Sequence, residues 1–424
     1  MNYTIIGNSA AAVAAIESIR SLDQQGEIVL FSKEAHYAYS RPTITEFLAG
    51  EEVMPEKRMG YRLPEFYQQL KITTHLSTMV SKVDPKKKII LLDNGQEHRF
   101  DKLLIATGGT PIIPDIPGKN KLGVFSLITR ADAHRIKSLL PEVKHVIVIG
   151  GGLIGMKTAE GLYEAGKKVT IIELIPHILG RILDVTGAEL VQQYLTKKGI
   201  EIITESTVEE ILGENHIESV RLRDGIILPC DMLILAIGVK PNFELVKDTG
   251  IQINRGIVVN DGMETNFPDI YAAGDVAEGP ELLSNQKSVI AIWPIAYRQG
   301  LVAGVNMAGD VKVYAGGVVQ NSIGILGLHT ISIGLVAPPK TEEYVVLTKK
   351  GLTEFGYRKM IFHNDTLVGT ILVTNIDRAG IFTGLIKEKT KFESLSDKEK
   401  LLDENFGLIS LPPAWRKEKL THPV

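Results

Sequence analysis

Hydrophobic positions along the chain fall into two alternating patterns. Runs of four or five apolar residues are typical of buried strands, and longer stretches with apolar residues three or four apart are typical of helices. A strand, a helix and a strand are expected at residues 3–6, 10–19 and 28–31, and again at 145–149, 153–165 and 169–173. This strand–helix–strand unit is half of a doubly wound parallel sheet, and it occurs twice.

Each copy continues in the same way. Turn signals at residues 93–95 (Asp-Asn-Gly) and 223–225 (Arg-Asp-Gly) each lie between two extended stretches and predict β-hairpins. Each hairpin is followed by a similar strand that ends in glycine, at residues 103–108 and 233–238. The nucleotide contacts expected at these strand ends are Ala106, Thr107, Gly108 and Gly238.

From about Tyr314 the pattern changes. Apolar runs at residues 330–335 and 367–373 predict strands, and a tail of mixed charge from Lys387 is expected to form a solvated helix. The sequence therefore predicts an α/β protein with two Rossmann-like dinucleotide-binding domains and a C-terminal α+β domain.

Composition excludes several function classes. The 424 residues include 44% hydrophobic and 23% charged positions, and the formal net charge of −3 gives no reason to expect a nucleic-acid partner. No apolar run approaches the roughly 18 residues that a membrane span needs. The first strand begins at about Tyr3, which leaves no room for a signal peptide, so we expect a cytoplasmic protein without a membrane partner. The ten histidines show no metal-ligand spacing, so no metal site is expected.

The turn after the strand expected at residues 145–149 has the form G-x-G-x-x-G, from Gly150 through Gly152 and Ile154 to Gly155. Glycines there permit a tight turn and let the backbone approach a pyrophosphate, which the following helix N-terminus stabilises. Glu173 ends the next strand at the distance expected for a carboxylate that binds a ribose 2′-hydroxyl. No arginine follows it, so NADH is favoured over NADPH. The plainer alternative is a glycine turn without a ligand.

The N-terminal copy of this turn departs from the pattern. Gly7 keeps the first glycine, whereas Ser9 replaces the second and Ala12 the third. Alanine is tolerated at the third position, which governs only helix–strand packing. The Ser9 side chain must turn away from a pyrophosphate, or its hydroxyl binds a phosphate oxygen.

A long pattern at residues 265–275 (Thr-Asn-Phe-Pro-Asp-Ile-Tyr-Ala-Ala-Gly-Asp) adds a resemblance to a known family. Together with the two glycine turns, it resembles the flavoproteins with two dinucleotide folds. These include NADH:rubredoxin and NADH:ferredoxin reductases and the flavin module of NADH nitrite reductase, within the FAD-dependent pyridine nucleotide-disulfide oxidoreductase superfamily. The resemblance covers about residues 1–390 and implies that the second domain is inserted into the first.

The resemblance implies an FAD-binding domain at residues 1–111 and 239–313, an NAD-binding domain at 112–238, and a C-terminal interface domain with a charged tail at 314–424. It also assigns roles to single residues. Asp275 corresponds to the residue that binds the flavin ribityl chain, Gly274 and the Gly7 turn lie against the diphosphate, and Glu34 binds the adenosine ribose. The remaining matches are the backbone of Val80 at the adenine, Arg41 and Pro42 beside the diphosphate and the flavin ring, and Trp293 and Gln299 in a segment that packs beside the flavin.

The chain lacks the thiols that many relatives of this superfamily use. The stretch from Arg41 to Thr45, where some members carry a cysteine, contains none, and Cys230 is the single cysteine of the chain. We expect Cys230 to be a buried structural thiol. One cysteine excludes a redox-active pair and a Cys-ligated iron–sulfur cluster within one chain. Electrons from the flavin are therefore expected to leave directly to an external acceptor.

These observations favour an FAD enzyme that takes a hydride from NADH and passes electrons to a small iron–sulfur carrier of the ferredoxin or rubredoxin type. The carrier is implied by the resemblance and not by particular residues. Two alternatives stay open: a flavin NADH oxidase or peroxidase that reduces oxygen species, and an NADH-sensing interaction protein resembling apoptosis-inducing factor. A second copy of the chain is a further candidate partner.

Two charged positions differ from their usual counterparts in related sequences. The residue two after the last glycine of the NAD turn is usually glutamate and here is Lys157. Its usual lysine partner, after the Arg-Pro segment, aligns with Glu46. Because both charges are inverted, we predict that Lys157 and Glu46 form an ion pair near flavin N5. The alternative is that each contacts solvent or another partner.

Overall fold

The computed structural model describes residues 1–284, 286–351, 353–407 and 411, which divide into two compact units. The first unit comprises residues 1–112, 128–130 and 239–317, and the second comprises residues 113–127, 131–238 and those from 318 onward. The predicted division into three domains stays a prediction.

The first unit is built on a five-stranded parallel sheet in the order β3-β2-β1-β7-β19. Its central strands are apolar on both faces, and Ile5, Leu30 and Leu104 are fully buried. Such runs are typical of parallel sheets that helices cover on both sides. The strands are β1 (Asn2–Ile6), β2 (Glu27–Phe31), β3 (Ile72–His75), β7 (Lys102–Ile105) and β19 (Ile270–Ala272).

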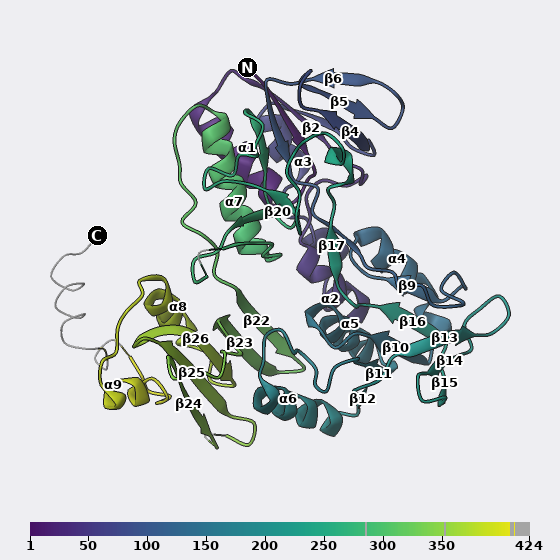
Figure 1. Cartoon of the computed structure of the whole chain (residues 1–424). Coiled ribbons are helices and arrows are strands. Elements are labelled where there is room, and N and C mark those ends of the chain that lie inside the picture. Colours follow the sequence, from purple (N-terminus) through teal and green to yellow (C-terminus); the bar gives the residue numbers. More distant parts are fainter. Residues whose placement is uncertain (285, 352, 408–410, 412–424) are drawn as a thin grey trace. The chain divides into compact units, whose positions relative to one another are not determined.

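Two helices of this unit, α1 (Ala10–Leu22) and α7 (Trp293–Met307), lie side by side although they come from opposite ends of the unit's sequence (Figure 1). A Cβ added to Gly300 would lie 2.0 Å from the Ala11 carbonyl oxygen, and one on Gly304 would lie 2.6 Å from the Ala15 carbonyl oxygen. Only glycine permits this approach of the two helix backbones.

Smaller elements complete the first unit, and the antiparallel strands β4-β5-β6 confirm the hairpin expected at residues 93–95. They are α2 (Ile44–Ala49), α3 (Pro64–Gln69), β4 (Val80–Asp84), β5 (Ile89–Leu92), β6 (Glu97–Arg99), β8 (Gly109–Pro111), β17 (Val239–Pro241), β18 (Ile257–Val258), β20 (Ala277–Pro280) and β21 (Lys287–Ser288).

The second unit repeats the plan with a parallel sheet in the order β12-β11-β10-β16-β9. An antiparallel sheet, β13-β14-β15, contains the second expected hairpin and packs its apolar residues against the parallel sheet. The elements are β9 (Val124–Ser126), α4 (Arg130–Leu139), β10 (His145–Ile149), α5 (Leu153–Glu164), β11 (Lys168–Ile172), α6 (Val185–Lys197), β12 (Glu201–Ile203), β13 (Val208–Leu212), β14 (Ser219–Leu222), β15 (Ile227–Pro229) and β16 (Met232–Leu235).

The same unit also contains a five-stranded antiparallel sheet in the order β22-β23-β26-β25-β24. The elements are β22 (Gln320–Ile325), β23 (Leu328–Gly334), β24 (Tyr344–Lys350), β25 (Tyr357–His363), β26 (Thr366–Val373), α8 (Ala379–Lys387) and α9 (Leu395–Lys400). The predicted α/β fold class, with two Rossmann-like sheets and a C-terminal α+β region, is confirmed.

The tail differs from the expectation of a solvated helix from Lys387. Helix α8 ends at that residue, and the next helix, α9, has six residues. Lys398 of α9 is buried and forms an ion pair with Asp365 at 2.6 Å, so this helix packs on the sheet instead of lying free in solvent. Residues 408–410 and 412–424 of the predicted tail lie outside the described residues.

Candidate functional site

The turn between β10 and α5 needs glycine at three positions for three different reasons. Gly150 has a φ of +107°, and a Cβ on it would lie 2.4 Å from the Ala236 carbonyl oxygen. A Cβ on Gly155 would lie 1.9 Å from the Gly150 carbonyl oxygen, so this glycine lets the helix pack on the turn. A Cβ on Gly152, the N-cap of α5, would meet no atom within 4 Å. Gly152 therefore leaves open space at the helix N-terminus, as an approaching phosphate requires.

Glu173 lies directly beside this turn. Its Oε2 accepts a hydrogen bond from the Gly151 N–H at 2.6 Å, and its Oε1 accepts one from the Ile175 N–H at 3.1 Å. The sequence predicted a ribose contact for Glu173, and the structure adds that its carboxylate holds the glycine turn. Leu174 and Ile175 are exposed and apolar, so they offer no cation for a 2′-phosphate.

The N-terminal turn has the same geometry around Gly7. This glycine has a φ of +109°, and a Cβ on it would lie 2.1 Å from the Ala106 carbonyl oxygen. Ser9 is the N-cap of α1, yet its hydroxyl accepts no hydrogen bond from a helix amide. Ala12 is fully buried, in agreement with a packing role. The first-turn amides of α1 and the Ser9 hydroxyl are therefore available to an anion.

Asn8, which sequence reasoning did not single out, carries a buried amide nitrogen. The Nδ2 atom has no hydrogen-bond partner among the described residues, whereas Oδ1 accepts from the Tyr67 hydroxyl at 2.6 Å. Buried polar groups are nearly always paired, so this donor fits a ligand oxygen. Its place directly after the first glycine of the turn was the signal in the sequence.

Glu34 and Arg41, two predicted residues of the FAD site, meet after the end of β2. Arg41 forms an ion pair with Glu34, and the Tyr39 hydroxyl donates to Glu34 Oε2 at 2.6 Å. Arg41 also donates to the Ile128 carbonyl oxygen at 2.8 Å. Burial acts to lower the pKa of Arg41, but Tyr39 and Glu34 outweigh it, and the pKa lies above its usual value. Pro42 lies within the 3₁₀ turn Arg41–Thr43 and helps to set its direction.

Asp275 follows β19 and is half-buried. Burial raises the pKa of its carboxyl group above the usual value, and the charge of Arg41 opposes this shift. From the described residues the carboxylate accepts no side-chain or backbone hydrogen bond. Gly274, with a φ of +81°, donates its N–H to Gln299 Oε1 at 2.9 Å. A half-buried carboxylate without a donor among the described residues fits a ligand hydroxyl group, such as one of the ribityl chain.

The other predicted contacts lie at strand ends and at the start of α7. Thr107 and Asn242 exchange two hydrogen bonds, of 2.7 and 3.0 Å. Gly108 and Gly238 both have positive φ values. Trp293, the first residue of α7, packs edge-to-face on Tyr61 with ring centroids 5.1 Å apart. The remaining positions are Ala106, directly after β7, Ile154, exposed, in α5, and Val80, buried, in β4.

Lys157 has partners within its own unit. Its ammonium group forms an ion pair with Glu160, one helical turn further along α5, and donates to the Gly324 carbonyl oxygen at 3.3 Å. Glu160 Oε1 also accepts from the Leu326 N–H at 2.6 Å. The Lys157–Glu160 pair therefore links α5 to the turn between β22 and β23. Glu46 is half-buried on α2 in the other unit. The Lys157–Glu46 pair stays a prediction.

Cys230 is free and buried, and burial raises the pKa of its thiol to about 12. A thiol with this pKa is protonated at neutral pH and is a poor nucleophile. Within the described part of the chain, no group of three or more His, Cys, Asp or Glu residues could hold a metal ion.

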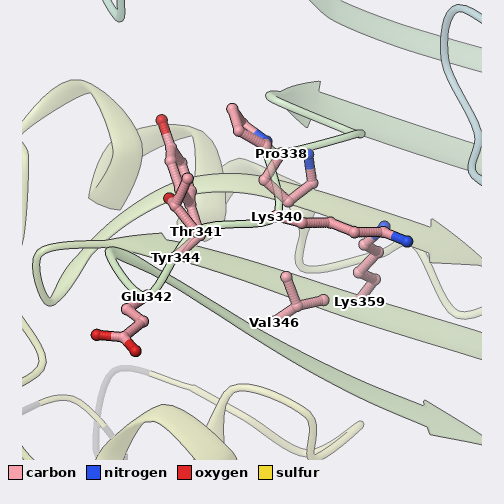
Figure 2. A pocket seen from close by; sticks show the side chains of 8 residues that line it. Pro338, Lys340, Thr341, Glu342, Tyr344, Val346 and Lys359 are labelled. Carbon is pink, nitrogen blue, oxygen red and sulfur yellow. The ribbon is translucent and has the colours of Figure 1, made fainter.

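A pocket of about 600 Å³ lies on the C-terminal antiparallel sheet, and none of its lining residues is a predicted site residue (Figure 2). Its wall includes Lys359, which is buried and forms an ion pair with Asp184 at 2.9 Å. Asp184 Oδ2 also accepts from the Tyr357 hydroxyl at 2.7 Å. Lys359 therefore links the N-terminus of α6 to the sheet through Asp184. The lining residues are Pro338, Pro339, Lys340, Thr341, Glu342, Tyr344, Val346 and Lys359.

Comparisons with known proteins decide the family. Residues 1–300 match the model of the pyridine nucleotide-disulphide oxidoreductases. The chain belongs to this family. Residues 320–390 match the rubredoxin NAD+ reductase C-terminal domain. The resemblance inferred from the sequence is confirmed, and the chain is an oxidoreductase that uses FAD and NADH.

Several relatives are similar along most of the chain. It is 33% identical to the NADH-dependent phenylglyoxylate dehydrogenase subunit epsilon of Aromatoleum evansii, over 98% of both chains. It is 35% identical to an NADH oxidase of Methanocaldococcus jannaschii, over 94% of both chains. The nitrite reductase [NAD(P)H] of Bacillus subtilis is 30% identical over 92% of this chain, which spans only 48% of that relative's length.

A solved structure is also similar. The NADH:rubredoxin oxidoreductase of Clostridium acetobutylicum superposes with a TM-score of 0.78 and 26% identity, over 93% of this chain and 97% of the other. No helix among the described residues is long and apolar enough to span a membrane.

Proposed function

We propose that this protein is an NADH:acceptor oxidoreductase that passes electrons from NADH through FAD to a small iron–sulfur carrier of the ferredoxin or rubredoxin type. The similarity of residues 320–390 to the rubredoxin NAD+ reductase C-terminal domain supports this acceptor most directly. The overall similarity to the clostridial NADH:rubredoxin oxidoreductase agrees with it. One NADH then reduces two one-electron carriers and leaves NAD⁺ and a proton.

In this proposal the N-terminal turn and the end of β19 hold FAD. The first-turn amides of α1 and the Ser9 hydroxyl bind the pyrophosphate, Glu34 binds the adenosine ribose, and Asp275 accepts a hydrogen bond from the ribityl chain. Bound FAD supplies the ability to take two electrons as a hydride and release them one at a time. The protein's task is to hold and orient the two nucleotides.

The second glycine turn holds NADH. The open space beside Gly152 receives the pyrophosphate at the N-terminus of α5, and Glu173 binds the ribose hydroxyls of the adenosine half. Because Glu173 already accepts two backbone hydrogen bonds, its carboxylate is fixed in orientation before the nucleotide binds. This preorganisation lowers the entropy cost of binding.

The exit of electrons does not involve a protein thiol in this proposal. Cys230 is the single cysteine, it is buried, and its thiol is protonated at neutral pH. No thiol can therefore relay electrons between NADH and the acceptor, so the acceptor must approach the flavin itself.

A panel of acceptors tests the proposal. Purified protein is supplied with NADH and with rubredoxin, ferredoxin, oxygen or hydrogen peroxide, and NADH consumption is followed at saturating acceptor. The proposal expects turnover with an iron–sulfur protein to exceed turnover with oxygen by at least tenfold. The similarity to an NADH oxidase makes direct oxygen reduction the second candidate. Faster turnover with oxygen or peroxide would establish that candidate, and slow turnover with all acceptors would favour an NADH-sensing role.

We also propose that the protein works in the cytoplasm, and that a homodimer is one of its assemblies. We further propose the domain boundaries that the family resemblance implies, with the NAD-binding domain at residues 112–238. Size-exclusion chromatography with light scattering measures the assembly, and limited proteolysis near residues 112 and 238 tests the boundaries.

A further inference from the structure

The side chain of Asn8 is held by a tyrosine from another part of the first unit. The Tyr67 hydroxyl donates to Asn8 Oδ1 at 2.6 Å and accepts a hydrogen bond from the Ala38 N–H at 3.3 Å. Tyr67 is buried, and its ring packs against Tyr37 with centroids 4.8 Å apart. The hydroxyl therefore has a fixed position and fixed partners.

These partners determine which way the Asn8 amide faces. A tyrosine hydroxyl has one proton, and the Ala38 N–H can only donate, so the proton goes to Asn8. The Asn8 atom that faces Tyr67 must then be the carbonyl oxygen, and the NH₂ group is turned to the other side. That Nδ2 atom is buried and lacks an acceptor among the described residues.

An acceptor for this group is expected at the turn between β1 and α1. Asn8 directly precedes Ser9, the N-cap of α1, whose hydroxyl makes no capping hydrogen bond, and the first turn of α1 contains no acidic residue. A helix N-terminus with unpaired donors favours an anion, and a phosphate group supplies several acceptor oxygens.

We propose that Asn8 binds the FAD pyrophosphate through Nδ2, and that Tyr67 is a positioning residue that fixes the orientation of the Asn8 amide. The proposal rests on the placement of the FAD pyrophosphate at this turn. It adds a side-chain donor to the backbone donors of the turn, and it explains why Tyr67 donates its proton to an asparagine in the turn between β1 and α1.

Ligand binding to flavin-free protein tests the proposal. FAD and riboflavin, which has no phosphate, are titrated into wild-type protein and variants, and the quenching of flavin fluorescence gives each Kd. We expect Asn8→Ala to raise the Kd for FAD about tenfold or more, because a hydrogen bond to a charged group is lost. Asn8→Asp keeps the acceptor for Tyr67 but turns a negative oxygen toward the phosphate, so its effect should be larger, about a hundredfold. The Kd for riboflavin should stay unchanged in both variants.

The role of Tyr67 has its own readout. Tyr67→Phe frees the amide to rotate and should weaken FAD binding about three- to fivefold, less than Asn8→Ala does. The double variant Asn8→Ala/Tyr67→Phe should bind FAD as tightly as Asn8→Ala alone, because Tyr67 acts through Asn8. Tyr37→Phe, which alters the same ring pair without touching Asn8, is the matched control.

Several results would overturn the proposal. Unchanged FAD binding in both Asn8 variants would remove Asn8 from the site, and additive losses in the double variant would show that Tyr67 acts independently. An equal loss of riboflavin binding would show a general structural effect. Wild-type protein that binds no FAD would instead overturn the proposed function itself. The titrations of the Asn8 variants decide whether Asn8 contacts FAD, even if Tyr67→Phe fails to fold.

Discussion

Replacing Glu173 with alanine should change both the choice of nicotinamide nucleotide and the stability of the glycine turn. The carboxylate is proposed to bind the adenosine ribose, and a hydrogen bond to a charged group contributes about 1.5–3 kcal/mol. Its loss corresponds to about a 10- to 140-fold decrease in kcat/KM for NADH, at 1.4 kcal/mol per factor of ten. The same carboxylate accepts from the Gly151 and Ile175 N–H groups, so the substitution also removes one hydrogen bond that holds the glycine turn and one that holds the segment after β11.

NADPH should gain little from this substitution. Removing the carboxylate removes its repulsion of the 2′-phosphate, but Leu174 and Ile175 supply no positive charge, and the turn that binds the pyrophosphate is less well held. The ratio of kcat/KM for NADH to kcat/KM for NADPH should therefore decrease, mainly because kcat/KM for NADH falls. A reversal of the nucleotide preference would also need an arginine in place of Leu174.

Initial rates with an artificial electron acceptor measure these effects. Wild type, Glu173→Ala and the control Glu189→Ala, an exposed acid on α6, are compared with both nucleotides over a range of concentrations. Glu189→Ala should behave as wild type. A wild-type preference for NADPH, or an unchanged ratio in Glu173→Ala, would refute the assignment of Glu173.

Other substitutions test separate parts of the account. Asp275→Ala should weaken FAD retention by about 1.5–3 kcal/mol, measured as FAD released on dilution; full retention would exclude a ribityl contact. Cys230→Ser should leave NADH oxidation by an artificial acceptor nearly unchanged, and loss of flavin reoxidation with FAD still bound would reveal a working thiol. Lys157→Glu should slow flavin reduction by NADH, and adding Glu46→Lys should recover part of the rate; simple additivity would contradict the ion pair. Asp184→Asn should lower the melting temperature at pH 7, since the folded state holds the pKa of this carboxyl group below its usual value and this stabilisation is present at neutral pH. The difference from wild type should shrink as the pH falls below about 4 and the carboxylate is protonated, and a constant difference across this range would argue against the Lys359 ion pair.

The local pattern of the sequence was enough to predict the elements that carry the site. Strand β10 has the predicted bounds, α5 ends one residue earlier than predicted, and β11 begins and ends one residue earlier than predicted. The glycine turn was equally predictable, because its positive φ and close backbone contacts can be met only by glycine. These features depend on neighbours along the chain.

Features that depend on distant residues could not be predicted in this way. The orientation of the Asn8 amide depends on Tyr67, 59 residues away, and no local pattern records that contact. The spacing placed Glu173 near a ribose but did not show that it holds Gly151. The partner of Lys157 is a different case. Glu160 lies three residues later on the same helix, and this spacing was a readable signal for an ion pair.

Rapid mixing tests the central claim most directly. Protein reconstituted with FAD is first mixed with one equivalent of NADH without oxygen. The loss of absorbance of the oxidised flavin is then followed over time. The reduced protein is then mixed with rubredoxin or ferredoxin. The account predicts fast bleaching by NADH, followed by return of the flavin absorbance as two equivalents of carrier are reduced, in wild type and in Cys230→Ser alike. A flavin that NADH reduces but that reoxidises only with oxygen, or only when Cys230 is present, would contradict it.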